Sequence, residues 1–266
     1  MIRHAPWSAP PYDFAIGLRT IPEDAWLEGG DAEAGRKTTL LAAEPHNVWG
    51  EQTGSRAGQA EVLALVEAAT GGKGDPSLAP LWAASLLCAD DLCLMERGPA
   101  GWALTAVSLC SPTFFTVEQS LGKSLEGLHA PVPGFETRFQ PRVLRMFDAL
   151  SPGPVLERCN WTVTGSGEAY LPASAPVRAG LAAIAADEAG SRLFLRIERQ
   201  TLRKLPDTGG VLFTIRAWRN PLNDLRNEPQ AMAAFEAAWL GLSADFRAYK
   251  GLASYDALVA AFLAQR

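Results

Sequence analysis

Histidines are few in this chain, which limits the chemistry that its side chains can carry. The 266 residues contain only His4, His46 and His129, so a metal site of several histidines within one chain is excluded. His129 is the strongest candidate for a functional histidine, because it lies at the end of an apolar helical face that Pro131 must end. An imidazole held at a helix end can donate from Nδ1 to a nearby carbonyl and present Nε2 to a metal ion. The pattern alone favours the alternative, a histidine that only caps the last carbonyls of its helix.

A row of arginines on one predicted strand forms a second group of candidates. Residues 193–218 predict two strands joined by a tight turn at 206–210, which is rich in turn-forming residues. On the first strand, the apolar face that ends at Ile197 continues as Arg199 and Arg203. A buried guanidinium is costly unless an anion meets it. The pattern therefore favours a strand that leaves the core at Ile197, with these arginines in solvent.

Three arginines of this hairpin are candidates for binding an anionic ligand, because a guanidinium matches the geometry of a carboxylate. They are Arg196, Arg199 and Arg216. The favoured alternative is ordinary cross-strand pairing with Glu198 or exposure to solvent. Since Glu198 shares a strand face with Arg196, we expect these two side chains to form a local pair.

Shorter segments supply the remaining candidates. Asn160 and Trp161 belong to a short predicted strand at 157–163 and are candidates to line a pocket. Their favoured alternatives are a strand edge and a core position. Asp90 and Asp91 interrupt two apolar runs, which predicts a solvated turn.

Composition narrows the class of protein. A hydrophobic content of 48% with 20% charged residues is typical of a globular protein. The net charge of −5 gives no basic surface for nucleic acid. No apolar run is long enough to span a bilayer, and the first residues lack an apolar signal core, so we expect a cytoplasmic protein without a membrane partner. The four cysteines form no C-x-x-C pair, which favours buried reduced thiols over a zinc site or disulfides.

The elements that must position these residues indicate one α+β domain over 1–266, with strands in the middle and helices on either side. We expect an arm at 1–55, a core at about 80–220 and closing helices at about 229–265. Thr116 to Gln119 fits a capping box that opens the helix leading to His129. The predicted helices are 56–69, 142–150, 176–190, 229–248 and 254–265, and an antiparallel meander is predicted from 81–88, 92–96 and 102–110.

Several sequence blocks resemble one known family. They are S-L-L-C-A-D-D-L-C-L-M-E at Ser85–Glu96, L-G-K-S-L-E-G-L-H-A-P-V-P-G at Leu121–Gly134, E-R-C-N-W at Glu157–Trp161, R-I-E-R-Q-T-L-R-K-L-P at Arg196–Pro206 and V-L-F-T-I-R at Val211–Arg216. D-F-A-I-G-L-R at Asp13–Arg19 and W-L-E at Trp26–Glu28 also fit. On these blocks the chain resembles the haem-dependent oxidative N-demethylase α-subunit family.

The resemblance implies a PAS-like antiparallel sheet with flanking helices that binds haem b. It also implies oxidative demethylation of a small secondary amine with O2, which gives a primary amine and formaldehyde. Electrons would come from NADPH through a separate reductase subunit that carries FMN and an iron–sulfur cluster. Nothing in this sequence resembles a flavin or iron–sulfur site, which agrees with a reductase on another chain.

The resemblance also suggests roles for individual residues. His129 is the expected axial ligand of the haem iron, since it is the only histidine inside a matching block. Arg199 is expected at a propionate or near iron-bound oxygen, where it would stabilise developing negative charge. Glu198, or a tryptophan face, is expected to hold the substrate ammonium. Arg196, Arg216, Asn160 and Trp161 are expected around the cofactor. The alternative is a non-catalytic PAS-like module that binds haem or a small ligand.

Overall fold

The computed structural model describes residues 2–13 and 15–265, so Phe14 of the D-F-A-I-G-L-R block lies outside the described residues. The chain forms two compact units. Unit 1 comprises residues 1–17, 159–198 and 217–266, and unit 2 comprises residues 18–158 and 199–216. Neither unit is a continuous stretch of sequence, because the chain enters each of them more than once.

One seven-stranded sheet runs through the fold, with the strand order β1-β5-β6-β7-β3-β4-β2. The pairs β1–β5, β3–β7, β3–β4 and β2–β4 are antiparallel. With helices around this sheet, the predicted α+β class is confirmed. The strands are β1 (Arg19–Ile21), β2 (Trp49–Glu51), β3 (Asp91–Gly98), β4 (Gly101–Ser108), β5 (Val155–Thr164), β6 (Phe194–Lys204) and β7 (Val211–Pro221).

The predicted hairpin at 193–218 is confirmed as β6 and β7. Leu205 N donates to Gly210 O over 2.9 Å and closes the turn, and Gly209 has a φ of +72°, which favours glycine. The prediction that the strand leaves the core at Ile197 is wrong. Arg199 and Arg203 are both buried, because carboxylates meet their guanidinium groups.

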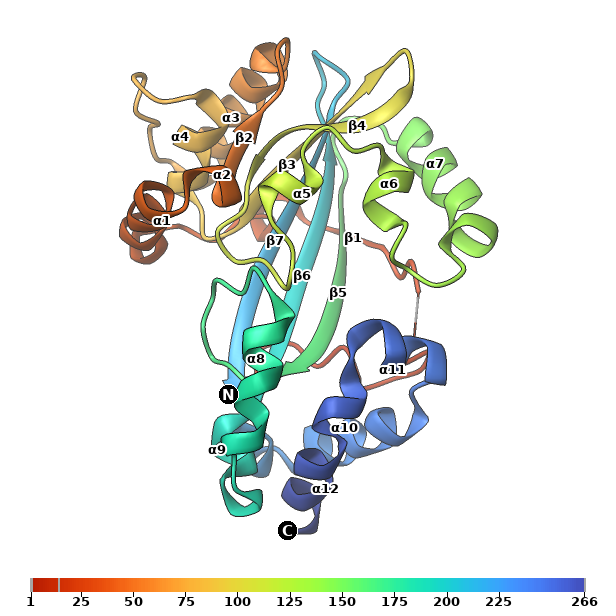
Figure 1. Cartoon of the computed structure of the whole chain (residues 1–266). Helices are drawn as coiled ribbons and strands as arrows, with labels where there is room; N and C mark the ends of the chain where they lie inside the picture. The colour runs from red at the N-terminus through yellow and green to blue at the C-terminus, as the bar shows by residue number, and fades with distance from the viewer. Residues whose placement is uncertain (1, 14, 266) are drawn as a thin grey trace. The chain divides into compact units, whose positions relative to one another are not determined.

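The strands of unit 2 are buried on both faces. On β3, Leu92 and Leu94 pack into one apolar cluster, whereas Cys93 and Met95 pack into another. The first cluster is covered by α3 (Arg56–Thr70) and α4 (Pro80–Leu87), and the second by α5 (Val117–Ser120), α6 (Leu125–His129) and α7 (Gln140–Ala149). Figure 1 shows α3 and α4 gathered apart from α6 and α7 within this unit. Burial on both faces explains why the strand sequences are almost continuously apolar.

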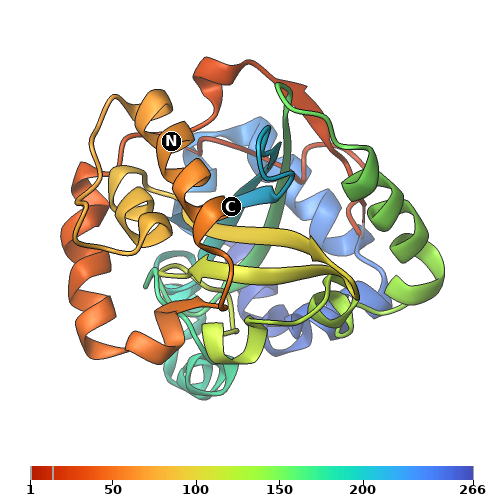
Figure 2. The ribbon, with the colours of Figure 1, turned by 90° about the horizontal axis from the view of Figure 1, so that it is seen from above.

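The predicted meander is correct in part. Gly98 pairs with Gly101 at the turn between β3 and β4, as predicted, and these two strands lie side by side in Figure 2. The third segment is wrong, because residues 80–87 form α4 and not a strand. Pro80 begins this helix, and most of its side chains are buried. A short helix that is apolar all round has no periodicity that separates it from a buried strand.

Two helix boundaries lie at glycines with positive φ, and the sequence patterns indicated only one of them. The helix predicted at 56–69 is confirmed as α3, which ends at Gly71 with a φ of +74°. The capping box at Thr116 is confirmed at the start of α5. The helix does not continue to His129, however, because Gly122 adopts a φ of +78° and α6 starts afresh after Ser124. His129 is the last residue of α6, as predicted.

The amino-terminal arm contains more structure than its sequence indicated. α1 (Asp31–Ala43) and α2 (Pro45–Val48) belong to unit 2 and were not predicted. Two tryptophans of the arm are core residues, one in each unit. Trp7 is buried in unit 1, and Trp26 is buried in unit 2.

Unit 1 carries the remaining helices around its own core. The helix predicted at 176–190 is broken into α8 (Ser174–Gly180), α9 (Ala189–Arg192) and short 3-10 turns between them. The closing helices are α10 (Pro229–Gly241), α11 (Ala244–Lys250) and α12 (Asp256–Ala264). Phe235 packs edge-on against Trp7 and Trp161 at ring-centroid distances of 6.1 and 5.9 Å. No helix in the described part of the chain is both long and apolar enough to cross a membrane.

Candidate functional site

The imidazole of His129 is held by two contacts. Its Nδ1 lies 2.8 Å from the carbonyl oxygen of Leu125. Its ring stacks on Phe135, with centroids 4.4 Å apart and an interplanar angle of 10°. A carbonyl oxygen only accepts, so Nδ1 must carry the proton and Nε2 must be the acceptor. Nε2 makes no hydrogen bond to any described residue.

The surroundings of His129 favour its neutral form. Burial lowers the pKa of the imidazole and outweighs the hydrogen bond to Leu125, which acts in the opposite direction. The nearby charge of Arg158 lowers this pKa further. Neutral imidazole with a lone pair on Nε2 is the form that binds a metal. The imidazole of His129 is therefore in the protonation state that a metal ligand requires.

Each nitrogen of the Arg199 guanidinium, in unit 2, has a partner within the chain. Its Nε pairs with Glu157 on β5, its Nη1 donates to the backbone carbonyl of Trp26 over 2.7 Å, and its Nη2 donates to that of Ala25. Glu157 also accepts from Arg19, which lies directly opposite on β1, over 2.6 Å. The guanidinium thus ties the arm to the sheet through groups that the chain itself supplies.

Glu157 is held as a carboxylate by these two arginines. Burial acts to raise the pKa of Glu157, but the hydrogen bonds from Arg199 and Arg19 outweigh it and leave the pKa below its usual value. A buried arginine and a buried glutamate are tolerated because each satisfies the other.

Trp26 docks on the arginine-bearing face of β6. Arg203 lies over its ring at 4.3 Å from the centroid and pairs with Glu23. The indole Nε1 donates to Thr201 over 3.1 Å, so the row Arg199, Thr201 and Arg203 surrounds this one tryptophan. The row therefore has a structural explanation that the strand pattern alone did not provide.

Asp90 and Asp91 do not form the predicted solvated turn, because both are fully buried. Asp91 accepts from the backbone N–H groups of Cys110 and Ser111 over 2.8 and 2.7 Å. Asp90 accepts from Thr214 over 3.2 Å through Oδ1, while its buried Oδ2 has no partner among the described residues. Burial raises the pKa of Asp90 to about 6, against the opposing charge of Lys37 and more distant arginines.

Lys37 is a buried cation that sequence reasoning missed. Its Nζ donates to the carbonyl oxygens of Ser85, Cys88 and Asp90 over 2.7, 3.1 and 2.6 Å. It thereby caps the carboxyl end of α4 and meets the acidic pair that follows. Its position on α1 gave no signal, since this helix was not predicted.

Arg216 lies in unit 2 beside acids of the arm. Its guanidinium is 3.6 Å from Glu28 and 3.8 Å from Glu33. It is half-buried.

Three of the predicted site residues come together in unit 1. The local pair of Arg196 with Glu198 is confirmed, with Nε and Oε1 3.8 Å apart. Asn160 Nδ2 donates to Glu198 over 3.5 Å, and Lys250 Nζ donates to Asn160 Oδ1 over 3.3 Å. The Arg196 side chain is fully buried. Lys250, at the end of α11, was not predicted, because it lies 90 residues from Asn160 in sequence.

Trp161 lies apart from this polar group. Its ring packs against Trp7 and Phe235 within the apolar core of unit 1. Successive residues of a strand point to opposite faces, so Trp161 faces the core while Asn160 faces Glu198. The core position that we gave as the alternative for Trp161 is the one observed.

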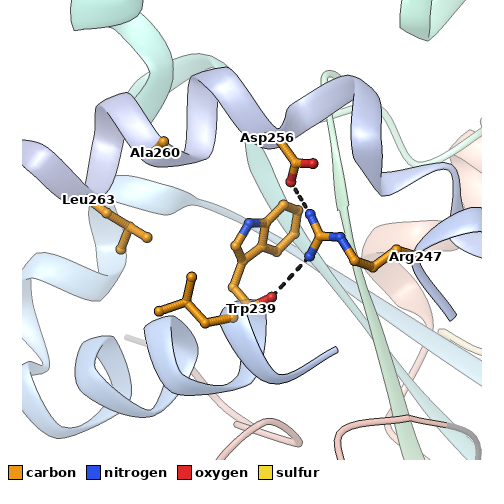
Figure 3. Close-up of a pocket in the computed structure, with 6 residues that line it drawn as sticks. Trp239, Arg247, Asp256, Ala260 and Leu263 are labelled. Carbon is orange, nitrogen blue, oxygen red and sulfur yellow. Dashed lines mark hydrogen bonds and ion pairs between the residues drawn. The ribbon is translucent and has the colours of Figure 1, made fainter. Parts of the chain in front are cut away.

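A pocket of about 320 Å³ opens in unit 1. Figure 3 shows Arg247 held between Asp256 and the carbonyl of Trp239, to which Nη1 donates over 3.0 Å. No predicted site residue lines this pocket, and its side chains include no donor that commonly binds haem iron. Its lining residues are Trp239, Leu240, Arg247, Asp256, Ala260 and Leu263.

A prosthetic group whose iron needs a single protein nitrogen fits the donors that the described residues supply. In the described residues, no three His, Cys, Asp or Glu side chains gather to hold a bare metal ion. His129 supplies one neutral nitrogen whose ring is fixed through its other nitrogen, as axial histidines are. Fold and site thus define an α+β protein with one oriented imidazole, whose Nε2 is left as an acceptor.

The comparison with known families agrees with this class. A family model described as haem-dependent oxidative N-demethylase, alpha subunit-like, matches residues 36–260. The chain belongs to this family. The match spans residues of both units, including His129 and the β6–β7 hairpin.

Proposed function

We propose that this protein binds haem b and oxidatively demethylates a small secondary amine, with dimethylamine as the type substrate. Its family membership supports the reaction class. The single observation that carries the proposal is the His129 imidazole, with Nδ1 fixed on Leu125 and Nε2 left as an acceptor. When bound, the haem would supply the activation of O2.

The overall chemistry balances with one two-electron donor. Dimethylamine, O2, NADPH and one proton give methylamine, formaldehyde, water and NADP+. The electrons are proposed to reach this chain from a separate NADPH-dependent subunit that carries FMN and an iron–sulfur cluster. The free cysteines, three of them buried, support a reducing compartment such as the cytoplasm.

The residues of this chain take distinct parts in the proposal. His129 would hold the iron through Nε2, and the hydrogen bond to Leu125 would raise its strength as a ligand. Arg216, which lies in unit 2 with His129, is proposed for a propionate, because a guanidinium binds carboxylates in a fork. Glu198, held by Asn160, is proposed to attract the substrate ammonium. For Arg199 the contacts support a tethering part in the arm and not a part in oxygen chemistry.

The first experiment is an absorbance spectrum of protein produced with a haem precursor. A Soret band is expected in the wild type, and His129→Ala is expected to lose stoichiometric haem or shift the band strongly. The matched control is His46→Ala, which removes a histidine from α2 and should leave the spectrum unchanged. An unchanged spectrum in His129→Ala would remove this residue from the iron.

A second candidate function is haem or small-ligand binding without turnover. The observation that favours it is the engagement of the predicted catalytic pair, since Arg199 is bound to Glu157 and Glu198 contacts Arg196 and Asn160. Supplying reductase and NADPH separates the two functions. Amine-dependent O2 uptake with formaldehyde release supports the enzyme, whereas reversible CO binding without amine-dependent O2 uptake supports the binding module.

A further inference from the structure

The plane of the His129 ring is set by a neighbour that the sequence blocks did not single out. We propose that Phe135 is a positioning residue, which fixes the orientation of the His129 imidazole and so the direction of Nε2. The inference rests on the proposed function, in which Nε2 holds the haem iron. The observation behind it is the stacked pair, with centroids 4.4 Å apart and planes 10° from parallel.

One hydrogen bond does not fix the orientation of an imidazole ring. The torsion that turns a histidine ring about its Cβ–Cγ bond has broad, shallow minima. The contact from Nδ1 to Leu125 sets where one edge of the ring points, but the ring can still tilt about that contact. A flat partner against the ring face removes this remaining freedom. Together, Leu125 and Phe135 define both the direction and the plane of the imidazole.

The chain between the two rings holds Phe135 in place. Val132 N donates to His129 O over 2.8 Å, and Phe135 N donates to Val132 O over 3.1 Å. Gly134 adopts a φ of +67°, which favours glycine, and a Cβ there would approach Arg138 to 3.0 Å. The turn after His129 therefore folds back and places the ring of Phe135 on the imidazole.

Phe135 is also anchored from its own side. It is buried, with 7% of its surface exposed, and it begins the π-helical turn η2 (Phe135–Phe139) that leads directly into α7. A single π turn is rare and is often found at functional sites. The stack is thus supported by a helix of the scaffold and not by a free loop. A ring plane fixed in this way would orient the ligand and tune the electronic state of the iron.

The first test uses haem-free protein and NMR of the histidine ring protons. His129→Ala assigns the His129 signals by their loss. Phe135→Leu keeps an apolar side chain but removes the aromatic ring, so the His129 signals should move downfield as the ring-current shielding disappears. Phe135→Tyr keeps the ring and should leave them near their wild-type positions. If the His129 signals stay in place in Phe135→Leu, the stacking role is overturned.

The second test uses ferric haem-loaded protein and electron paramagnetic resonance. The wild type and Phe135→Tyr should give one set of g values, whereas Phe135→Leu should give a broadened or split set at unchanged haem content. Unchanged g values in Phe135→Leu, with His129→Ala still losing haem, would overturn this inference and leave the proposed function standing. Haem retained in His129→Ala would overturn both. If Phe135→Leu does not fold, Phe135→Met replaces it under the same criteria.

Discussion

The buried arginines of β6 in unit 2 are organised around a single tryptophan. Arg199 donates to the carbonyl of Trp26, Thr201 accepts from its indole, and Arg203 covers its ring. Each cation of the row has an anion, Glu157 or Glu23, within direct contact. The cost of burying the guanidinium of Arg199 is thus offset by a carboxylate and two carbonyls, which also fix the arm on the sheet.

Removing Arg199 should destabilise the fold strongly. Arg199→Ala leaves the buried Glu157 carboxylate without its main partner, and breaking a buried pair in this way costs about 3–5 kcal/mol. The matched control is Arg19→Ala, which removes the exposed partner of the same carboxylate and should cost less than about 1 kcal/mol. Urea unfolding at pH 7 measures both losses. Equal losses for the two variants would contradict the structural role of Arg199.

The Arg199–Glu157 pair also predicts how the stability of the protein changes with pH. Because the folded-state pKa of Glu157 is lowered, its stabilising contribution is present above the ordinary value of 4.5 and disappears as the pH falls through the folded pKa. The stability gap between wild type and Arg199→Ala should therefore narrow as the pH is lowered below about 4.5. Unfolding curves across pH 3–7 check this, and a gap that widens in acid would refute it.

Asp90 should make the stability of the protein depend on pH in the opposite direction. Its pKa is raised from 3.8 to about 6, so the folded protein binds more protons than the unfolded chain in this window and loses stability as the pH rises. Relative to Asp90→Asn, the wild type should lose about 3 kcal/mol between pH 3.5 and pH 7. Asp187→Asn, an exposed substitution, serves as the control for general charge removal. If the difference in stability between wild type and Asp90→Asn does not change with pH, the pKa of Asp90 is not raised in the folded protein.

At the scale of elements, the sequence predicted what local rules determine. The capping box at Thr116, the glycine end of α3 and the turn of the β6–β7 hairpin depend on neighbouring residues, and all three are confirmed. The solvated turn predicted at Asp90–Asp91 is wrong because a distant cation meets this pair, and the strand predicted at Leu81–Cys88 is wrong because a short apolar run has no periodicity that separates a helix from a strand. Lys37 reaches Asp90 from an element 53 residues away, and no local pattern reports such a contact.

The short helix that carries His129 depends on its cap. Ser124 accepts from Gly127 N over 3.1 Å at the start of α6, which has only five residues. Ser124→Ala should lower the free energy of unfolding by about 1 kcal/mol and speed hydrogen exchange at the Gly127 amide. Ser124→Asp retains a capping oxygen and should leave both nearly unchanged. Slow exchange at Gly127 in Ser124→Ala would mean that packing alone holds α6.

At the scale of the whole molecule, the two units share three strands. β5 passes from one unit to the other between Arg158 and Cys159, β6 between Glu198 and Arg199, and β7 between Arg216 and Ala217. A strand that loses its pairing in one unit frees the neighbouring residues of the same strand in the other. We therefore expect the units to unfold together, although each has a core of its own.

A pair of core substitutions tests this coupling. Phe235→Leu weakens the core of unit 1 and Val66→Ala weakens that of unit 2; both residues are fully buried, and each change should cost about 1–3 kcal/mol. If the units unfold together, calorimetry gives one transition, and either substitution lowers its midpoint by several degrees. If they unfold separately, two transitions appear and each substitution moves only one of them. That second outcome would mean that the shared strands do not couple the unfolding of the two units. The site residues proposed on β6 and His129 would then belong to parts that fold independently.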